Sequence, residues 1–264
     1  MSALARAPLQ LMNTHLNMKG ANESAKRKRA STDPIEKVRR LVHRYHEKAI
    51  PHRAPTKKEP SFDISKTWDS DPSWTSWTHP GTHLKYSLSL MSARRLSSDD
   101  FNTCYHLIEE TSRADYEAST TGWKSVKKIA EMKSPELRYI LVKNEEGVVR
   151  GFTSLMPTYE EGEPVVYCYE IHLASELQRT GLGRLLMSFL ESVASHTPPI
   201  KKIMLTCFLS NKGALRFYES AGFTKDPISP VPKKLRYGRE FIPDYAIMSK
   251  IVDSSKAVLG PAPS

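Results

Sequence analysis

Apolar and polar positions follow two different periods along this chain, and the pattern is regular only from about residue 84 onward. Some stretches alternate or are continuously apolar, as strands are. In others apolar residues recur every three or four positions, as they do on the buried face of a helix. The pattern predicts strands at 84–93, 138–143, 148–157, 165–173, 201–208 and 241–251, and helices at 99–119, 122–132, 181–195 and 212–221. This order of elements predicts an α/β fold, with a mixed central β-sheet flanked by helices.

The first 80 residues follow a different pattern. Residues 1–30 have no apolar periodicity and end in Lys26-Arg27-Lys28-Arg29. Asp33-Pro34 then marks the start of an amphipathic helix that ends near Ile50. Several Pro and Trp residues in 51–80 predict an irregular segment whose aromatic rings cover the core. We therefore divide the chain into a basic, disordered arm (1–30), an N-terminal helix with a wrapping segment (31–80), a folded domain (81–251) and a tail (252–264).

Charge is distributed unevenly along the chain. The net charge of the 264 residues is +10, but residues 1–60 alone hold 14 Lys/Arg and 5 Asp/Glu. The body is therefore nearly neutral, which argues against a nucleic-acid-binding body. The four consecutive basic residues fit either a nuclear import signal or a solvated charge run. No apolar run is long enough to span a membrane. The three Cys lack metal-ligand spacing, so we expect no metal.

The first candidate binding motif is Gln178-Arg179-Thr180-Gly181-Leu182-Gly183, between a predicted strand and a predicted helix. Glycines let backbone N–H groups turn inward, and a helix N-terminus adds positive potential, so the stretch is typical of a pyrophosphate site. Alone the signal is weak, because tight turns also use glycine. The stretch lacks the Lys-Ser/Thr of an ATP-binding loop and the third glycine of a dinucleotide fingerprint.

The second stretch runs from Asn211 to Tyr218 and is followed by Ala221-Gly222-Phe223. By itself it can be an ordinary amphipathic helix with a glycine stop. The two stretches together, each after a strand, resemble the GCN5-related N-acetyltransferase (GNAT) superfamily over roughly residues 84–250. The resemblance implies the GNAT fold, preceded here by an N-terminal helical extension, and acetyl-CoA as the co-substrate.

A narrower resemblance rests on Tyr167-Cys168-Tyr169-Glu170, on the strand that leads into the glycine stretch. Together with Asp115-Tyr116-Glu117, Gly122-Trp123-Lys124 and the basic N-terminal helix, it is similar to the N-alpha-acetyltransferase D family. That family acetylates the N-terminal serine of core histones of the H-four and H-two-A types, which begin Ser-Gly-Arg-Gly. The resemblance therefore implies N-terminal serine acetylation, with histone tails as partners.

The resemblance also implies catalytic roles. Glu170 would be the general base, with Tyr169 beside it, and Tyr218 would protonate the CoA thiolate. Alternatively, Glu170 is a structural carboxylate whose hydrogen bonds are all made within the fold, and Tyr218 is an aromatic residue that only packs in the core. An α-amine is easier to deprotonate than a lysine by roughly 3 kcal/mol, so a modest base suffices. Strand alternation predicts Cys168, Glu170 and His172 on one face, unless a bulge re-aims one of them.

Two further groups of residues follow from the resemblance. Those expected around acetyl-CoA are Ile171, His172, Leu173, Gln178, Arg179, Thr180, Gly181, Leu182, Gly183, Arg184, Asn211, Ala214 and Phe217, with the backbone N–H of Ile171 or Leu173 holding the carbonyl oxygen. Those expected around the substrate are Tyr116, Thr158, Glu160, Glu161, Tyr167, Thr206 and Tyr245. Thr158 stands where the family has an Asp, and Thr121 where it has a Trp. The acid that meets the substrate arginine is therefore Glu160 or Glu161, unless both lie in a solvated loop.

Two other classes of function remain open from the sequence. One is a lysine or small-amine acetyltransferase on the same fold, and the other is a catalytically inactive chromatin-binding module. For the leading interpretation we expect a monomer located in nucleus and cytoplasm, with no sequence-specific nucleic acid binding and no membrane association.

Overall fold

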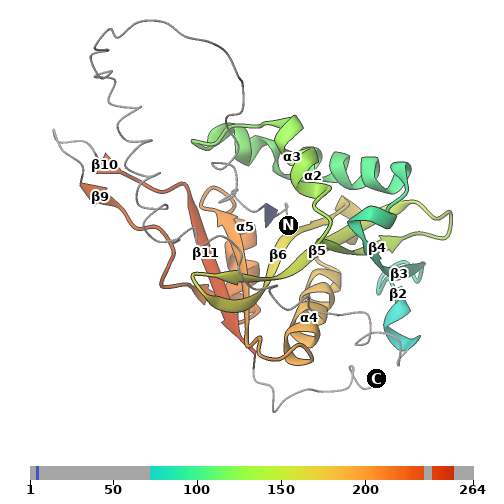
Figure 1. The fold of residues 1–264 in the computed structure, drawn as a ribbon. Helices are drawn as coiled ribbons and strands as arrows, with labels where there is room; N and C mark the ends of the chain where they lie inside the picture. Colours follow the sequence, from blue (N-terminus) through green and yellow to red (C-terminus); the bar gives the residue numbers. More distant parts are fainter. Residues whose placement is uncertain (1–3, 6–71, 235–239, 253–264) are drawn as a thin grey trace, which may run out of the picture. The chain divides into compact units, whose positions relative to one another are not determined.

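The computed structural model describes residues 4–5, 72–234 and 240–252 (Figure 1). Their main feature is a nine-stranded mixed sheet in the order β2-β3-β4-β5-β6-β7-β11-β8, with β1 paired to β6. Its strands are β1 (Leu4–Ala5), β2 (Ser76–Thr78), β3 (Lys85–Ser92), β4 (Arg138–Lys143), β5 (Val149–Glu160), β6 (Glu163–Leu173), β7 (Lys202–Phe208), β8 (Thr224–Lys225) and β11 (Tyr245–Ile251). A separate two-stranded sheet pairs β9 (Lys233–Lys234) with β10 (Glu240–Phe241).

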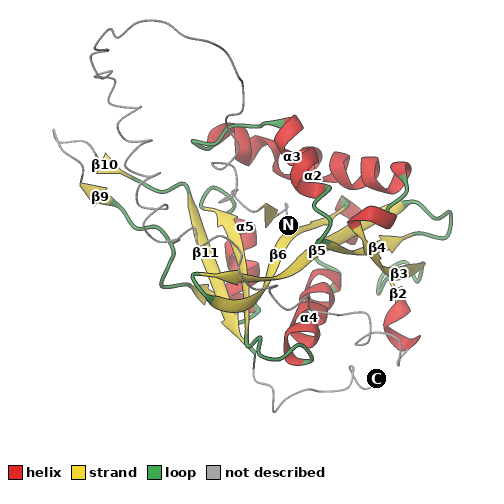
Figure 2. Cartoon of the chain, viewed as in Figure 1, coloured by secondary structure: helices red, strands yellow, loops and turns green. Residues whose placement is uncertain are grey.

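Helices cover both faces of this sheet (Figure 2). The helices α2 (Ser98–Ala118) and α3 (Ser125–Met132) lie on one face, and α4 (Leu182–Ser195) and α5 (Lys212–Ser220) on the other. Short 3-10 turns occupy Pro72–Thr75, Ala93–Arg95 and Ser175–Leu177. The predicted mixed α/β sheet flanked by helices is thus confirmed. The predicted N-terminal helix lies outside the described residues, as do the predicted arm and tail apart from Leu4–Ala5 and Val252. Leu4–Ala5 pair with β6 as β1, so the prediction of a disordered arm is wrong at these two residues.

The largest core cluster lies between the sheet and α4 and α5. It includes Leu186, Leu190 and Val193 of α4 and Tyr218 of α5, packed against side chains of β3 to β7 and β11. Trp74 and Trp77 pack against the same cluster, as predicted for the wrapping segment. The pattern did not predict that Ser76–Thr78 within this segment pairs with β3 as an edge strand.

Helix ends are set by local chemistry. The Ser97 side chain accepts a hydrogen bond from the Asp100 N–H, and Asp99 and Asp100 occupy the positive first turn of α2. Asn211 caps α5 by accepting from the Ala214 N–H at 3.0 Å. None of the helices in the described ranges is long and apolar enough to cross a membrane.

The strands β5 and β6 form a longer hairpin than the pattern predicts. The pairing runs on to Glu160↔Glu163, and Glu161 and Gly162 make the turn with φ of 48° and 84°. Both central residues thus have the positive φ of the tight turns that suit the twist of hairpin strands. Glu160 therefore lies at the end of a strand, where the solvated-loop alternative placed it in a loop.

The strands β6 and β7 are the parallel pair, and they pair only over Val166–Cys168 and Ile203–Leu205. Beyond Cys168, β6 continues to Leu173 without β7, and the short strand β1 pairs with it at Glu170 and Ile171. The edge of β6 from Glu170 onward thus accepts an extended backbone other than β7.

The predicted last strand, 241–251, needs correction. Phe241 belongs to β10, which pairs with β9, and the sheet strand β11 begins at Tyr245. Pro243 lies between the two. Because proline lacks a backbone N–H and fixes φ, a continuous ladder through this position is disfavoured.

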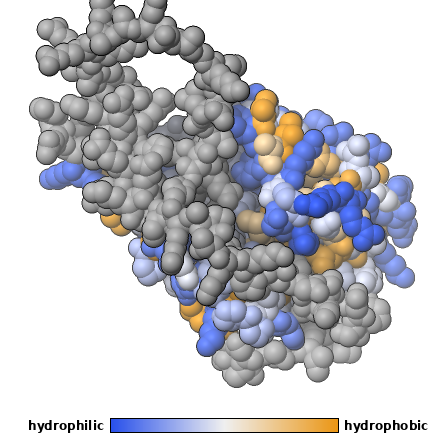
Figure 3. Space-filling model, in the orientation of Figure 1, coloured by the Kyte–Doolittle hydropathy of each residue, from blue (hydrophilic) through white to orange (hydrophobic). Residues whose placement is uncertain are grey.

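The surface in Figure 3 is mostly hydrophilic where it is visible, with a small hydrophobic patch in the region of α3. Val126 of α3 is 80% exposed. Single exposed hydrophobic residues of this kind are common on soluble domains.

Candidate active site

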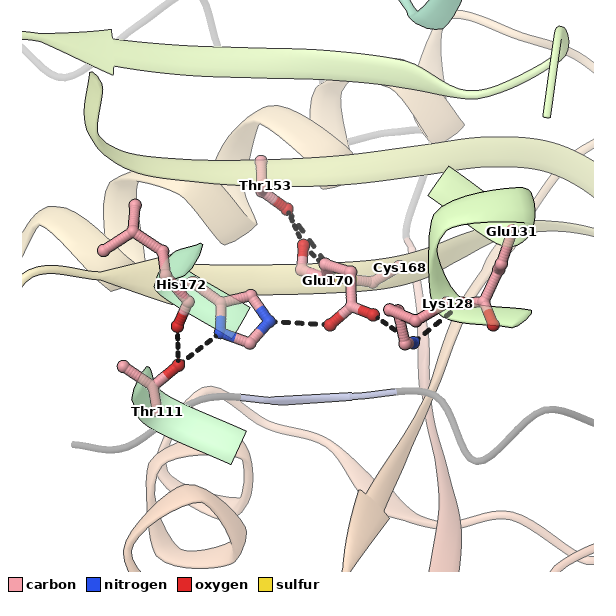
Figure 4. Close-up of polar contacts among 8 residues, drawn as sticks. Thr111, Lys128, Glu131, Thr153, Cys168, Glu170 and His172 are labelled. Carbon is pink, nitrogen blue, oxygen red and sulfur yellow. Dashed lines mark hydrogen bonds and ion pairs between the residues drawn. The ribbon is translucent and has the colours of Figure 1, made fainter. Parts of the chain in front are cut away.

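A buried cluster of charged side chains surrounds Glu170 on β6 (Figure 4). The Lys128 Nζ donates to Glu170 Oε1 at 2.7 Å, and His172 Nε2 lies 2.6 Å from Glu170 Oε2. Lys128 also donates to Glu131 at 3.1 Å, one turn along α3. Glu170 is only 2% exposed. Isolated buried charges are costly, so this arrangement persists because each charge faces an opposite one.

The electrostatics of this cluster favour its ionised form. Burial pushes the pKa of Glu170 up, but Lys128 and the hydrogen bond from His172 outweigh it, so the pKa lies below its ordinary value. Burial lowers the pKa of Lys128, but the carboxylates of Glu131 and Glu170 more than offset this and hold it well above the ordinary value. At neutral pH Glu170 is therefore a carboxylate and Lys128 an ammonium.

A bulge at Tyr169 decides which way Glu170 points. In the ladder with β5, Ser154 is opposite Glu170, whereas the next residue, Leu155, is opposite Cys168. Tyr169 is thus the extra residue, as the sequence allowed. The predicted shared face of Cys168, Glu170 and His172 is wrong, because the bulge reverses the alternation. Cys168 joins the core beneath α4, whereas Glu170 and His172 face α2 and α3.

The ring of His172 is held on three sides. Its Nδ1 lies 2.7 Å from the Thr111 hydroxyl of α2, and its face stacks on Phe152 at 5.4 Å between centroids. The side chain is thus committed to Glu170 and α2. A part for His172 in cofactor binding is therefore left to its backbone.

The glycine stretch forms the turn into α4, with Gly181 as the N-cap at φ 90°. Arg179 also has a positive φ of 63°. The Gln178 side chain donates to the Leu173 carbonyl at 3.0 Å and Thr180 donates to that of Leu177 at 2.7 Å, so these side chains brace the turn. The first N–H groups of α4 have no acceptor within the helix. This geometry suits an anion such as a phosphate.

Gly183 lies beside the Phe217 ring of α5. A Cβ added there would be in van der Waals contact with this ring, 3.4 Å away, so a larger side chain would meet α5. Arg184 also spans the two helices by donating to the Ser220 carbonyl at 3.3 Å. A Cβ added at Gly181, in contrast, meets nothing within 4 Å.

Two predicted residues of α5 differ in whether their polar atoms are free to bind a ligand. The Asn211 oxygen is used as the helix cap. Tyr218 is fully buried, and its hydroxyl has no hydrogen-bond partner among the described residues. Burial raises the pKa of Tyr218 well above its ordinary value, so it keeps its proton. An unpaired buried hydroxyl is rare, and here it provides a donor beneath β6 and β7 that fits a polar ligand group.

The predicted substrate residues gather around two aromatic pairs. Tyr116 packs on Phe208 at 4.9 Å between ring centroids, with Trp123 and Tyr245 against them. Tyr167 and Thr206 share a hydrogen bond of 2.6 Å, and the Tyr169 ring lies 5.5 Å from that of Tyr167. Lys128 lies 5.0 Å from the centroid of the Tyr116 ring, which joins the first group to the charged cluster.

The predicted acids lie at the other end of the hairpin. Opposed residues share a face, so Ser154, Met156, Thr158 and Glu160 project from the same face of β5 as Glu170 does from β6. Glu161 lies in the turn. Glu163, opposite Glu160, shares this face, and its carboxylate accepts from the Lys202 ammonium at 2.7 Å. Of the two predicted acids, Glu160 therefore continues the face of Glu170, whereas Glu161 does not.

Sequence reasoning missed Thr111, Lys128 and Glu131. Lys128 lies in Lys127-Lys128, where it resembles a surface lysine, and only its place on the inner face of α3 distinguishes it. The helical period was the available signal, because Lys128 and Met132 are the two buried residues of α3. No group of three or more potential metal ligands occurs among the described residues.

Comparisons with known proteins show what this chain is similar to. Residues 98–223 match the sequence profile of the acetyltransferase (GNAT) family. Over 155 residues the chain is 35% identical to N-alpha-acetyltransferase 40 of Saccharomyces cerevisiae, which covers 50% of this chain and 54% of the relative. The match thus spans about half the length of that curated relative.

The solved structures that the chain matches include two from bacteria. The ribosomal-protein-S18-alanine N-acetyltransferase of Escherichia coli is 21% identical with a TM-score of 0.42, covering 62% of this chain and 94% of its own. The phosphinothricin acetyltransferase of Sinorhizobium meliloti, in complex with AcCoA, is 15% identical with a TM-score of 0.46, covering 66% and 93%.

Proposed function

We propose that this protein transfers an acetyl group from acetyl-CoA to the N-terminal amine of a polypeptide, because residues 98–223 match the acetyltransferase (GNAT) family. The observation that carries the proposal is the buried anionic Glu170, placed where β6 parts from β7 and three residues before the end of the strand that leads to the glycine turn. The name of the yeast relative supports an N-terminal amine as the acceptor.

The proposed roles follow from the geometry. Bound acetyl-CoA supplies the acetyl thioester, and the turn before α4 with the first N–H groups of that helix holds its phosphates. Glu170 accepts the proton that the attacking amine loses, directly or through water. The buried Tyr218 hydroxyl donates a proton to the departing sulfur. An α-amine, with a pKa of about 8, is already partly neutral near pH 7, so a carboxylate of low pKa is a sufficient base.

We further propose that the substrate begins Ser-Gly-Arg-Gly, as in core histone tails, which makes these tails the partners and nucleus and cytoplasm the locations. A small first residue suits a site crowded by Tyr167 and Tyr169. Glu160 pairs with Glu163, seven residues before Glu170, so it lies on the order of 20 Å along the strand. Two extended substrate residues cover about 7 Å, and the long side chains of the substrate arginine and Glu160 cover the remainder.

The test is a panel of synthetic peptides with acetyl-CoA, with products mapped by mass spectrometry. We expect α-amine acetylation of Ser-Gly-Arg-Gly peptides and none when the N-terminus is blocked. Acetylation of a lysine side chain or a polyamine in place of the α-amine would establish a lysine or small-amine acetyltransferase. Acetyl-CoA binding without transfer to any amine would establish a binding module.

A further inference from the structure

Lys128 is placed in a way that packing alone does not require. Its side chain is 3% exposed, and its ammonium lies between the carboxylates of Glu170 and Glu131 (Figure 4). The ammonium also lies over the face of the Tyr116 ring. Apolar residues in place of the whole buried ion pair would fill this volume without the cost of burying charges, and such replacements of complete pairs are often neutral or stabilising. The presence of a buried ammonium is therefore best explained by its effect on Glu170.

The hydrogen bonds of His172 show what Glu170 faces on its other side. The Thr111 hydroxyl donates to the Leu107 carbonyl at 2.5 Å, and a carbonyl cannot donate in return. The Thr111 oxygen must therefore accept from Nδ1–H of His172. The bond between Nε2 of His172 and Oε2 of Glu170 then needs one further proton, which the two groups share.

Each oxygen of Glu170 thus has a donor, but the two donors are not equivalent. His172 can share a proton that belongs to the carboxyl group, whereas Lys128 offers three donors and accepts none. Only Lys128 therefore distinguishes a carboxylate from a carboxylic acid at this position. Glu131 in turn prevents Lys128 from turning away along α3.

We propose that Lys128 is a positioning residue for acetyl transfer, which keeps Glu170 anionic and aimed at the substrate amine while Glu131 holds Lys128 in place. This proposal rests on the function proposed above. Without the ammonium, Glu170 keeps its burial but loses its strongest stabilising charge. The acid form then persists to higher pH, and the base is absent where the wild-type protein still has it.

The other titratable groups near Glu170 do not compete for this role. Tyr116 of α2, Tyr139 of β4, Cys168 of β6 and Tyr218 of α5 all have their pKa values raised, chiefly by burial, and that of Cys168 reaches about 12. These groups stay neutral across the working range of pH. The charges nearest Glu170 are therefore those of Lys128 and Glu131, and His172 shares a proton with its second oxygen.

The test compares Lys128→Met with Lys127→Met in the full-length chain. Lys127 is the exposed neighbour on the same helix, so it controls for the loss of a lysine. With the amine that the wild-type protein acetylates, kcat and KM are measured from about pH 6 to 9.5. We expect Lys128→Met to lower kcat by about 10- to 100-fold near neutral pH. The KM values for acetyl-CoA and for the amine should stay within about threefold of wild type. The fall of kcat on the acid side of the pH profile should move to higher pH. Lys128→Arg should recover part of the loss, and Lys127→Met should behave as wild type.

An even loss at every pH, or turnover within about threefold of wild type, overturns the positioning role and leaves the proposed function intact. If Lys128→Met does not fold, Lys128→Met combined with Glu131→Gln removes the ion pair with its charges balanced, and the same shift is expected. A readout without turnover is the infrared signal of Glu170, identified by its loss in Glu170→Gln. A carboxylic acid signal near pH 6 in the lysine variant alone supports the proposal, and identical signals overturn it. Failure of all N-terminal peptides, in contrast, overturns the proposed function.

Discussion

The two faces of the sheet carry the two halves of the candidate site. One half consists of charged side chains, and the other consists mainly of backbone groups. On the α2 and α3 face, Glu170 is held by the side chains of Lys128 and His172. On the α4 and α5 face, the candidate anion site is a backbone turn at Gly181, and the buried Tyr218 hydroxyl has no hydrogen-bond partner among the described residues. Charge is thus concentrated where we propose that a proton is taken, and backbone N–H groups lie where we propose that phosphate is held.

The largest effect should come from breaking the charged half. Glu170→Gln keeps the shape and removes the base, so we expect turnover to fall by about 10²–10⁴-fold. Acetyl-CoA affinity, measured by calorimetry, should stay within about twofold, because the turn before α4 is untouched. Turnover within about threefold of wild type would make Glu170 a structural carboxylate.

On the opposite face, Tyr218→Phe separates packing from proton donation. The ring packs against Phe223, with centroids 5.6 Å apart, and phenylalanine keeps this contact. Because the hydroxyl has no partner among the described residues, its removal should leave the melting temperature unchanged or raise it. We nevertheless expect kcat to fall by about tenfold or more. Unchanged kcat in the folded variant would reduce Tyr218 to a packed aromatic.

The cofactor half is broken at Gly181, because a valine there is strained at φ 90° and covers the backbone that faces the anion. Gly147→Val is a matched control, since Gly147 has φ 77° and likewise has nothing within 4 Å of an added Cβ. We expect Gly181→Val to weaken acetyl-CoA binding about tenfold or more, and Gly147→Val to lower stability alone. Equal affinities in the two folded variants would contradict the assignment. Gly183 is a poorer test, because a side chain there also meets Phe217.

The same contrast explains how far the sequence alone was informative. The anion turn is contiguous in sequence, so Gln178 to Gly183 and the following helix could be predicted together. The charged half draws on residues from α2, α3 and β6, which only the tertiary fold brings together. The role of Lys128 was hidden because a lysine on a short helix is usually solvated. The direction of Glu170 could not be derived either, because a single bulged residue, Tyr169, reverses strand alternation without a clear sequence signal.

The smallest expected effect sharpens the comparison along the face that Glu170 shares with β5. Glu160 continues this face, whereas its neighbour Glu161 lies in the turn. Glu160→Gln should lower kcat/KM for a Ser-Gly-Arg-Gly peptide about tenfold, since a hydrogen bond to a charged group contributes roughly 1.5–3 kcal/mol. Glu161→Gln is the matched control and should change it by less than twofold.

A double-mutant cycle tests whether Glu160 and the substrate arginine are partners. Replacing that arginine by alanine should cause a loss similar to that of Glu160→Gln. With the alanine peptide, Glu160→Gln should then cause little further loss, because the interaction is already absent. Losses that simply add would mean that another acid binds the arginine. The recognition of the third substrate residue would then be separate from the face on which the first residue reacts.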